Sequence, residues 1–309
     1  MNYWNNKAYY TLNQYLKEKF GRKVIKLSLD GGFTCPNRDG TIGHRGCIFC
    51  GEEGAGEFTS EANGIRAQME QQISLLSEKW KEASYIAYFQ SFTNTYAPVS
   101  MLKALYDEAL SFPGTMGLAI ATRPDCLSDE VLELLSSYHR KTFLWIELGL
   151  QTIHEETAVF LRRGYSLPVF EEALGKLRAL KIPTVAHIIV NLPSETRRDI
   201  IDTVTYLSDR GIWGLKIHIL YISSDTDLYP YYLSHPFPLM ERDEYIDTVA
   251  DLLCHISPDI VIHRLTGDGD KRTLIAPNWI KDKRAVLNGI DRKMRMNDLY
   301  QGKYWKPKT

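Results

Sequence analysis

Seven short apolar runs alternate along the chain with longer amphipathic stretches. The runs are rich in Val, Ile, Leu and aromatic residues without strict polar alternation, at residues 24–29, 85–89, 117–121, 143–148, 184–190, 215–222 and 260–265. Helix-like segments separate them, near residues 62–82, 98–111, 128–140, 167–180, 196–210 and 241–254. This pattern predicts parallel strands that are covered on both faces, each followed by a helix.

Repeated strand–helix units are typical of two architectures, a complete or partial barrel and a doubly wound sheet. The first run leads into a cysteine-containing loop rather than a Gly-x-Gly-x-x-Gly turn, which disfavours a dinucleotide-binding sheet. In a barrel, the loops after the strands meet at one end and carry the chemistry. We therefore expect the cysteine loop to lie beside residues 90–98, 122–125, 151–163, 191–196 and 223–227.

The composition indicates a globular protein, with 44% hydrophobic and 24% charged residues among 309. No apolar run reaches the ~20 residues that a membrane span needs, and no charged-then-apolar leader opens the chain. Three of the five cysteines are clustered, which suits a reducing compartment better than a disulfide framework. We expect a soluble cytoplasmic protein without membrane contact.

The net charge of −1 hides basic ends around an acidic body. Residues 1–26 carry +5, residues 271–309 carry +8 and residues 27–270 carry −14. Basic ends are either solvated or bind a polyanion. The last segment interleaves its cations with four aromatic residues, Trp279, Tyr300, Tyr304 and Trp305. That composition suits phosphates and stacked bases, and it predicts salt-sensitive tRNA binding that weakens when residues 271–309 are removed.

Three cysteines, Cys35, Cys47 and Cys50, lie in one loop after the first apolar run. Thiolates suit iron–sulfur clusters and zinc alike. Three thiolates leave one iron of a [4Fe–4S] cluster open for a small molecule, whereas His44 would complete a Cys3His zinc site. Spacing alone leaves both kinds of site open.

Polar residues also interrupt or end two later runs. Glu147 and Gln151 flank the end of the fourth run, and Arg163 follows in the next loop. His187 lies inside the otherwise apolar fifth run. A buried carboxylate is costly unless it is paired or liganded. Glu147 and His187 therefore indicate either a hydrogen-bonded core pair or a ligand site at the top of a barrel.

Five motifs occur in order along the chain, at residues 28–40, 121–125, 147–152, 191–196 and 263–268. With the cysteine loop they resemble the radical S-adenosylmethionine (SAM) superfamily. The eleven residues between the first two cysteines are similar to the spacing in the group that contains the Elongator catalytic subunit. The motifs together resemble the YhcC/YtqA group more closely, over residues 3 to 309.

The resemblance implies a [4Fe–4S] cluster on Cys35, Cys47 and Cys50, with SAM on the open iron. Reductive cleavage of SAM would give a 5′-deoxyadenosyl radical that abstracts a substrate hydrogen. By motif position the residues that contact SAM are Gln90, Ser91, Phe92, Thr93, Thr122, Glu147, Gln151, Arg163 and His187. Glu147 and His187 are also the catalytic candidates. The second-strand motif lacks the family's paired glycines, and Asn191 and Ser194 replace glycines in the fourth motif.

The implied fold is α/β, a partial (β/α)6-type radical SAM barrel at residues 24–268. It lies between a basic helical segment at 1–23 and a basic aromatic extension at 269–309 that packs on the barrel. The implied reaction converts 5-carboxymethylaminomethyl-2-thiouridine at the tRNA wobble position to 5-aminomethyl-2-thiouridine, with a low-potential electron donor such as flavodoxin or ferredoxin. The alternatives are a radical SAM enzyme with another substrate and a zinc-stabilised RNA-binding module without catalysis.

Overall fold

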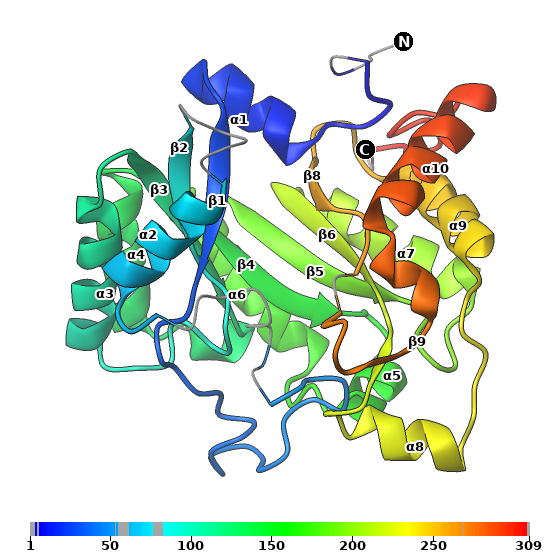
Figure 1. Cartoon of the computed structure of the whole chain (residues 1–309), viewed down its shortest axis with the longest axis horizontal. Helices are drawn as coiled ribbons and strands as arrows, with labels where there is room; N and C mark the ends of the chain where they lie inside the picture. The colour runs from blue at the N-terminus through cyan, green and yellow to red at the C-terminus, as the bar shows by residue number, and fades with distance from the viewer. Residues whose placement is uncertain are drawn as a thin grey trace.

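A seven-stranded parallel sheet forms the centre of the computed structural model, which describes residues 4, 6–52, 54, 62–76, 83–267 and 269–307. The strands pair in the order β1-β2-β3-β4-β5-β6-β8 and curl into a half barrel (Figure 1). They are β1 (Val24–Leu29), β2 (Ser84–Phe89), β3 (Thr115–Thr122), β4 (Phe143–Gln151), β5 (Thr184–Val190), β6 (Gly214–Ile219) and β8 (Val261–Arg264). The expected partial barrel is confirmed, with seven strands in the sheet.

Six helices cover the outer face of the sheet, at the positions that the apolar periodicity predicts (Figure 1). They are α2 (Ile65–Leu76), α3 (Val99–Ser111), α4 (Asp129–His139), α6 (Leu167–Ala179), α7 (Arg197–Asp209) and α9 (Arg242–His255). The start signal at Ser128 is confirmed, because its side chain accepts a hydrogen bond from the backbone N–H of Val131. The segment near residues 62–82 was predicted as one helix; its residues 77–82 lie outside the described residues.

The amino-terminal end of the half barrel is closed by α1 (Leu12–Phe20). This helix contacts both edge strands, β1 and β8, and Thr11 pairs with Ile262 just before it begins. Leu12 and Leu16, one turn apart, join a core of inward-facing residues from the strands, among them Trp145. Apolar side chains therefore fill this end, whereas the cysteine loop follows β1 at the carboxyl end of the strands.

Some elements were not among the predicted strands and helices. Three are short and carry little periodicity: α5 (Glu155–Phe160), α8 (Leu228–Ser234) and a small sheet of β7 (Ile222–Ser223) with β9 (Leu274–Ala276). The other, α10 (Lys283–Met296), is a helix of 14 residues in the C-terminal extension. The run at 215–222 was predicted as one strand, but β6 ends at Ile219 and β7 turns away to pair with β9. In α10, three apolar residues four positions apart, Val286, Ile290 and Met294, make a narrow buried stripe.

The C-terminal extension belongs to the folded body. Helix α10 packs on α9, and the Gln301 side chain donates hydrogen bonds to the carbonyls of Ser257 and Ile260. The Trp279 indole donates to the Met240 carbonyl and packs on the core. This aromatic residue, expected to stack on bases, therefore serves packing, whereas Tyr304 is exposed.

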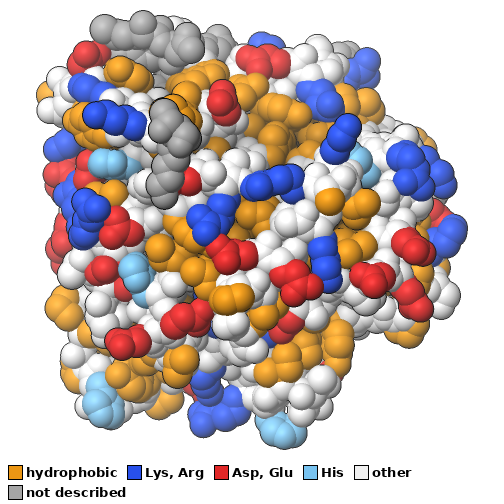
Figure 2. All heavy atoms as spheres, turned by 180° about the vertical axis from the view of Figure 1, so that it is seen from behind, with side chains coloured by type: hydrophobic (Ala, Val, Ile, Leu, Met, Phe, Trp, Pro, Cys, Tyr) orange, Lys and Arg blue, Asp and Glu red, His pale blue; other side chains and the backbone are white. Residues whose placement is uncertain are grey.

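Figure 2 shows the face opposite to that of Figure 1, where basic and acidic side chains are interspersed rather than gathered by sign. An RNA-binding surface normally concentrates cations. The mixed pattern does not mark this face as such a surface. Within the described residues, no helix combines the length and apolar character needed to cross a membrane.

Candidate active site

The cysteine loop follows β1 and is tied down over the carboxyl end of the sheet. The backbone N–H of Ile48 donates to the Leu161 carbonyl after α5, and the Ile48 carbonyl accepts from Leu228 at the start of α8. The Arg38 guanidinium donates to the Cys50 carbonyl at 2.8 Å. Helices α5 and α8, which also contact each other through Phe160 and Tyr231, thus hold the loop through Ile48, a member of a small apolar core.

A cavity of about 170 Å³, here called the cluster cavity, opens beneath this loop and contains the three cysteines. It brings together nearly all of the residues predicted to bind SAM: Gln90, Phe92, Thr93, Thr122, Glu147, Gln151, Arg163 and His187. Ser91 is the exception, since it is fully buried outside the lining. These positions come from β2, β3, β4, β5 and the following loops, as expected for the carboxyl end of a barrel.

The donor set fits a [4Fe–4S] cluster better than zinc. His44, the fourth ligand of the zinc alternative, is exposed and does not line the cluster cavity. Among the described residues, no three His, Cys, Asp or Glu side chains converge closely enough to hold one metal ion. A zinc site requires such convergence, whereas in a cuboidal cluster each cysteine binds its own iron, so the thiols stand apart.

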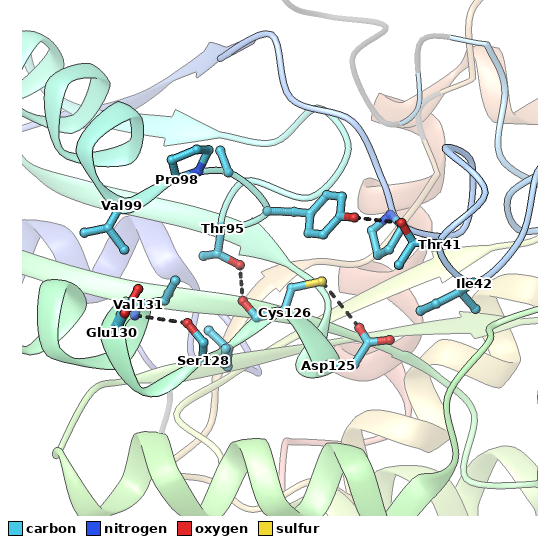
Figure 3. A pocket seen from close by; sticks show the side chains of 14 residues that line it. Thr41, Ile42, Thr95, Pro98, Val99, Asp125, Cys126, Ser128, Glu130 and Val131 are labelled. Atoms are coloured by element: carbon cyan, nitrogen blue, oxygen red, sulfur yellow. Dashed lines mark hydrogen bonds between the residues drawn. The ribbon is translucent and has the colours of Figure 1, made fainter.

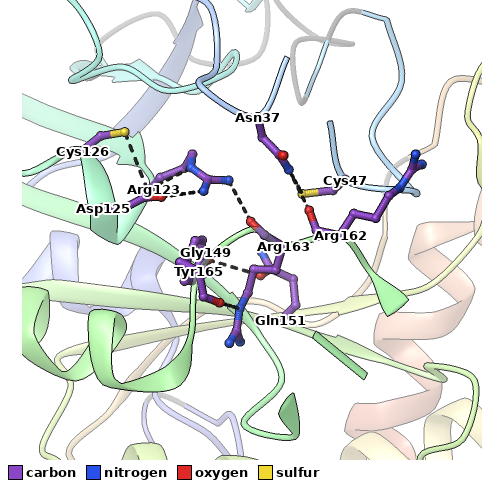
Figure 4. A network of polar contacts seen from close by, with 10 residues as sticks. All are labelled: Asn37, Cys47, Arg123, Asp125, Cys126, Gly149, Gln151, Arg162, Arg163 and Tyr165. Atoms are coloured by element: carbon purple, nitrogen blue, oxygen red, sulfur yellow. Dashed lines mark hydrogen bonds and ion pairs between the residues drawn. The ribbon is translucent and has the colours of Figure 1, made fainter. Parts of the chain in front are cut away.

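The surroundings of Cys47 also suit a metal-bound thiolate (Figure 4). The Asn37 amide lies 3.7 Å from Cys47 Sγ and donates to the Arg162 carbonyl at 2.7 Å. Burial, together with the neighbouring Cys50 and Cys35, raises the pKa of the Cys47 thiol to about 12. Such a thiol becomes a thiolate when a cation binds it.

Left-handed backbone occurs at the positions where family glycines are missing. Phe92 has φ 57°, Asn191 has φ 68° and Ser194 has φ 71°. Glycine adopts this region without steric cost, and other residues do so rarely. The backbone at these motifs therefore keeps the conformation that glycine would adopt. At Asn191 the side chain stabilises this conformation by accepting a hydrogen bond from the Met240 N–H at 2.8 Å.

Arg163 is almost fully buried, at 1% exposed, and its side chain is engaged by the protein (Figure 4). The guanidinium donates to the carbonyls of Leu150 and Thr152 at 2.9 and 2.8 Å, and to the Tyr165 carbonyl at 2.9 Å. These bonds hold the chain on both sides of Gln151, which has φ 65° at an irregularity in β4. Arg163 lines the cavity, and its hydrogen bonds are those of a residue that positions Gln151.

Glu147 is the centre of a buried polar network inside the half barrel. Its Oε2 accepts hydrogen bonds from Tyr88 and His187, each at 2.8 Å, and from Lys216. Its Oε1 accepts from the Trp145 indole at 2.8 Å. Burial alone would raise the pKa of Glu147, but the charges of the nearby lysines and the bond from His187 outweigh it and hold the pKa well below its usual range.

Two lysine amines lie beside this one carboxylate. Lys216 Nζ bonds Glu147 directly, and Nζ of the half-buried Lys26 lies 3.9 Å from its Oε1. Burial lowers the pKa of both lysines, against the opposing charge of Glu147. The interior next to the cluster cavity therefore disfavours the charged form of these amines, and a bound anion would favour it.

His187 is neutral at physiological pH. Burial, and next the charge of Lys216, lower its pKa to about 4, against the opposing effect of Glu147. An ionised carboxylate only accepts hydrogen bonds, so the network assigns the ring proton to Nε2. That tautomer leaves His187 Nδ1 as an acceptor on a ring that lines the cluster cavity.

A second cavity of about 240 Å³, here called the cationic cavity, adjoins the first. The two share seven lining residues: Phe49, Cys50, Gly54, Tyr88, Gln90, Gln151 and His187. Sequence reasoning missed the residues that distinguish the second cavity, Lys216, His218 and Arg264. The sequence did contain a signal for these residues. Lys216 and His218 are polar residues two positions apart in an otherwise apolar strand, so both side chains lie on the same face of the sheet.

A wider hollow of about 730 Å³ lies on the outer side of the cysteine loop (Figure 3). Its walls include Thr41, Thr95 and Cys126, and the Thr95 hydroxyl donates to the Cys126 carbonyl at 2.6 Å. None of the residues predicted to bind the cluster or SAM lines it. Its size alone does not make it the active site.

Comparison with known families shows which superfamily the chain belongs to. The radical SAM superfamily model matches residues 39–207, and the radical SAM C-terminal domain model matches residues 212–296. The chain belongs to the radical SAM superfamily. Membership in this family implies an iron–sulfur cluster and SAM, and the chain's own cysteine loop and cluster cavity fit both. Cys35, Cys47 and Cys50 are the residues that would hold the cluster.

Radical SAM relatives of similar length match along the whole chain. It is 41% identical to YtqA of Bacillus subtilis (strain 168), over 97% of this chain and 93% of that protein. It is 33% identical to YhcC of Escherichia coli (strain K12), over 95% and 96%.

A solved structure, the archaeal Methanocaldococcus infernus Elp3 with an N-terminal deletion, shares the fold with a TM-score of 0.66 at 15% identity. The match covers 90% of this chain and 64% of the archaeal one. The half-barrel fold thus extends to a distant relative.

Proposed function

We propose that this protein is a radical SAM enzyme that modifies the wobble uridine of tRNA. The reaction is conversion of 5-carboxymethylaminomethyl-2-thiouridine to 5-aminomethyl-2-thiouridine. The observation that carries the proposal is the junction of the two cavities, which places the basic side chains of Lys216 and Arg264 beside the expected SAM site. The substrate has a carboxylate one carbon from the nitrogen whose C–N bond must break, so a cationic wall beside the reaction centre suits it.

The chemistry balances with SAM as the oxidant. SAM bound at the cluster supplies hydrogen abstraction from the glycyl CH2 and takes up two electrons overall, ending as methionine and 5′-deoxyadenosine. The substrate loses two electrons to form an imine, and water releases the aminomethyl product and glyoxylate. The protein's part is to hold the glycyl carbon still and admit one water. Neutral His187 offers Nδ1 as an acceptor for the substrate's N–H.

The basic C-terminal helix supports an RNA substrate. Arg284, Arg292 and Arg295 on α10 are all exposed. Three arginines along one helix offer phosphate contacts of the kind that dominate RNA affinity. The resemblance of the chain to the group with YtqA and Elongator-type proteins adds to this support.

The deciding experiment is anaerobic incubation of reconstituted enzyme with SAM, reductant and tRNA that carries the carboxymethylaminomethyl group. Nucleoside mass spectrometry is expected to show loss of that nucleoside and gain of the aminomethyl one. The Cys47→Ala variant is the control and should leave the tRNA unchanged. Unchanged tRNA with active wild-type enzyme, judged by SAM cleavage, would favour a different substrate for the same radical chemistry.

A further inference from the structure

The cationic cavity has β6 and the residues after it as one wall and lies directly beside the cluster cavity. Lys216 and His218 come from β6, and Tyr221 and Leu220 follow it. A group bound here therefore contacts residues that also face the SAM site. The cavity holds about 240 Å³ and shares part of its lining with the cluster cavity, so it forms a side chamber of the expected SAM site. It suits a substituent of a substrate rather than the whole substrate.

Glu147 is the carboxylate that contacts Lys216 in the wall of this cavity. Both oxygens of that carboxylate already accept hydrogen bonds, from Trp145 on one side and from Tyr88, His187 and Lys216 on the other. Lys216 also donates to the Tyr88 hydroxyl at 2.7 Å. An ammonium group can make three hydrogen bonds, so Lys216 retains capacity for one more acceptor. An anion in the cavity would supply that acceptor and would favour the charged form of Lys216.

His218 provides a second polar atom without a partner. Its Nε2 is buried and has no hydrogen-bond partner among the described residues. The His218 ring packs against the His187 ring, with centroids 5.3 Å apart. A buried ring nitrogen without a partner is costly, and the cost disappears when a ligand pairs with it. Lys216 and His218, two residues apart on one strand, thus present a cation and a ring nitrogen to the same space.

We propose that the cationic cavity is the subsite for a carboxylate carried by the substrate, bound by Lys216 and His218. The inference rests on the proposed function for the identity of that substrate. A carboxylate fits better than a phosphate of the RNA backbone, because the reacting carbon must lie in the adjoining cluster cavity. Only a group within a bond or two of that carbon reaches both spaces.

The test compares two anticodon stem-loops bound to the reconstituted enzyme without reductant. One carries the carboxymethylaminomethyl group and the other its primary amide, which has the same shape without the charge. Fluorescence anisotropy should show about tenfold tighter binding of the carboxylate form to wild type, the range of a charge-assisted hydrogen bond. The His218→Leu and Lys216→Met variants should bind the two RNAs about equally.

The matched control is His255→Leu, which changes an equally half-buried histidine on α9, outside both cavities. It should keep the tenfold preference. A wild-type enzyme without the preference would overturn the proposal. So would a preference that persists in both His218→Leu and Lys216→Met.

A second experiment, with small molecules in place of RNA, tests the carboxylate subsite independently of the proposed tRNA reaction. N-methylglycine, N-methylglycinamide and inorganic phosphate are each added to the holoenzyme, and the melting temperature is measured. N-methylglycine alone should raise it, by about 2 °C near saturation, and His218→Leu should abolish the shift. If the tRNA is not converted but this shift is seen, the subsite stands and the tRNA assignment fails. Stabilisation by phosphate alone would overturn the carboxylate subsite.

Discussion

His187 Nε2 and Glu147 Oε2 lie 2.8 Å apart inside the half barrel, joining β5 to β4 at the floor of the cluster cavity. The pair links fold and site, because the same carboxylate that orients His187 also holds Lys216. The ring's remaining nitrogen is left for a ligand. Stability and ligand binding therefore depend on one buried network.

Removing the charge of Glu147 should destabilise the protein strongly. Glu147→Gln leaves Lys216 and Lys26 without a counter-ion, and a buried pair broken in this way typically costs about 3–5 kcal/mol. Urea unfolding of reduced, metal-free protein measures the loss. Adding Lys216→Met should recover part of it. The control Glu171→Gln, which removes a half-exposed partner of Arg210, should cost about 1 kcal/mol or less; equal costs for both variants would contradict the network.

His187 should make the stability of the protein depend on pH. Its pKa is about 4 in the folded state, below the usual 6.5, so the unfolded chain binds a proton first as pH falls. The free energy of unfolding should therefore decrease from pH 7.5 to 5, with about 1–2 kcal/mol due to His187. His187→Gln should show a smaller decrease over this range. Parallel curves for the two proteins in equilibrium unfolding would refute the assignment.

The three loop cysteines should be needed for the cluster, whereas Cys126 should not. Anaerobic reconstitution of wild type should give about four irons per chain and absorbance near 400 nm. Cys35→Ala and Cys50→Ala should lose most of both. Cys126→Ser, a change in the outer hollow, should keep them. Iron retained by either loop variant, or zinc in place of iron, would contradict the assignment.

Ser194→Gly should stabilise the protein. Ser194 is exposed with φ 71°, a region that glycine adopts without the steric cost of a side chain. We expect a gain of about 0.5–1 kcal/mol in the free energy of unfolding. Ser100→Gly, at an exposed position in α3, is the matched control and should instead lose about 0.5 kcal/mol. The same sign for both would show that the left-handed backbone is unimportant.

RNA affinity should depend on the exposed arginines of α10. Deletion of residues 271–309 is not a clean test, because α10 and Gln301 help to hold the fold. Replacing Arg284, Arg292 and Arg295 together by serine should weaken tRNA binding and reduce the slope of log affinity against log salt by about 2. A control with Arg140, Arg178 and Arg198, exposed on other helices, should keep both values. An equal loss of tRNA affinity in the two triple variants would show that α10 is not the RNA-binding surface.

Much of the fold follows from local pattern. The strands at 24–29 and 184–190 have the bounds that the apolar runs predict, because a strand buried on both faces must be apolar throughout. The cysteines were found by residue type and spacing alone. Helix α8 and the β7–β9 pair were missed, because short elements stabilised by tertiary contacts leave little periodicity to read.

The sequence by itself determined the order of strands and helices and the three thiols of the metal site. Only the tertiary structure decided that Lys26, Tyr88, Glu147, Lys216 and His263 share one interior, although they come from five different strands. Each of these residues alone is a costly polar break in an apolar run. His263 Nδ1 lies 3.9 Å from Glu147 Oε1 and makes no hydrogen bond among the described residues. Lys26, Tyr88 and Lys216 each meet Glu147, on another strand more than forty residues away, and side-chain geometry alone shows that partner.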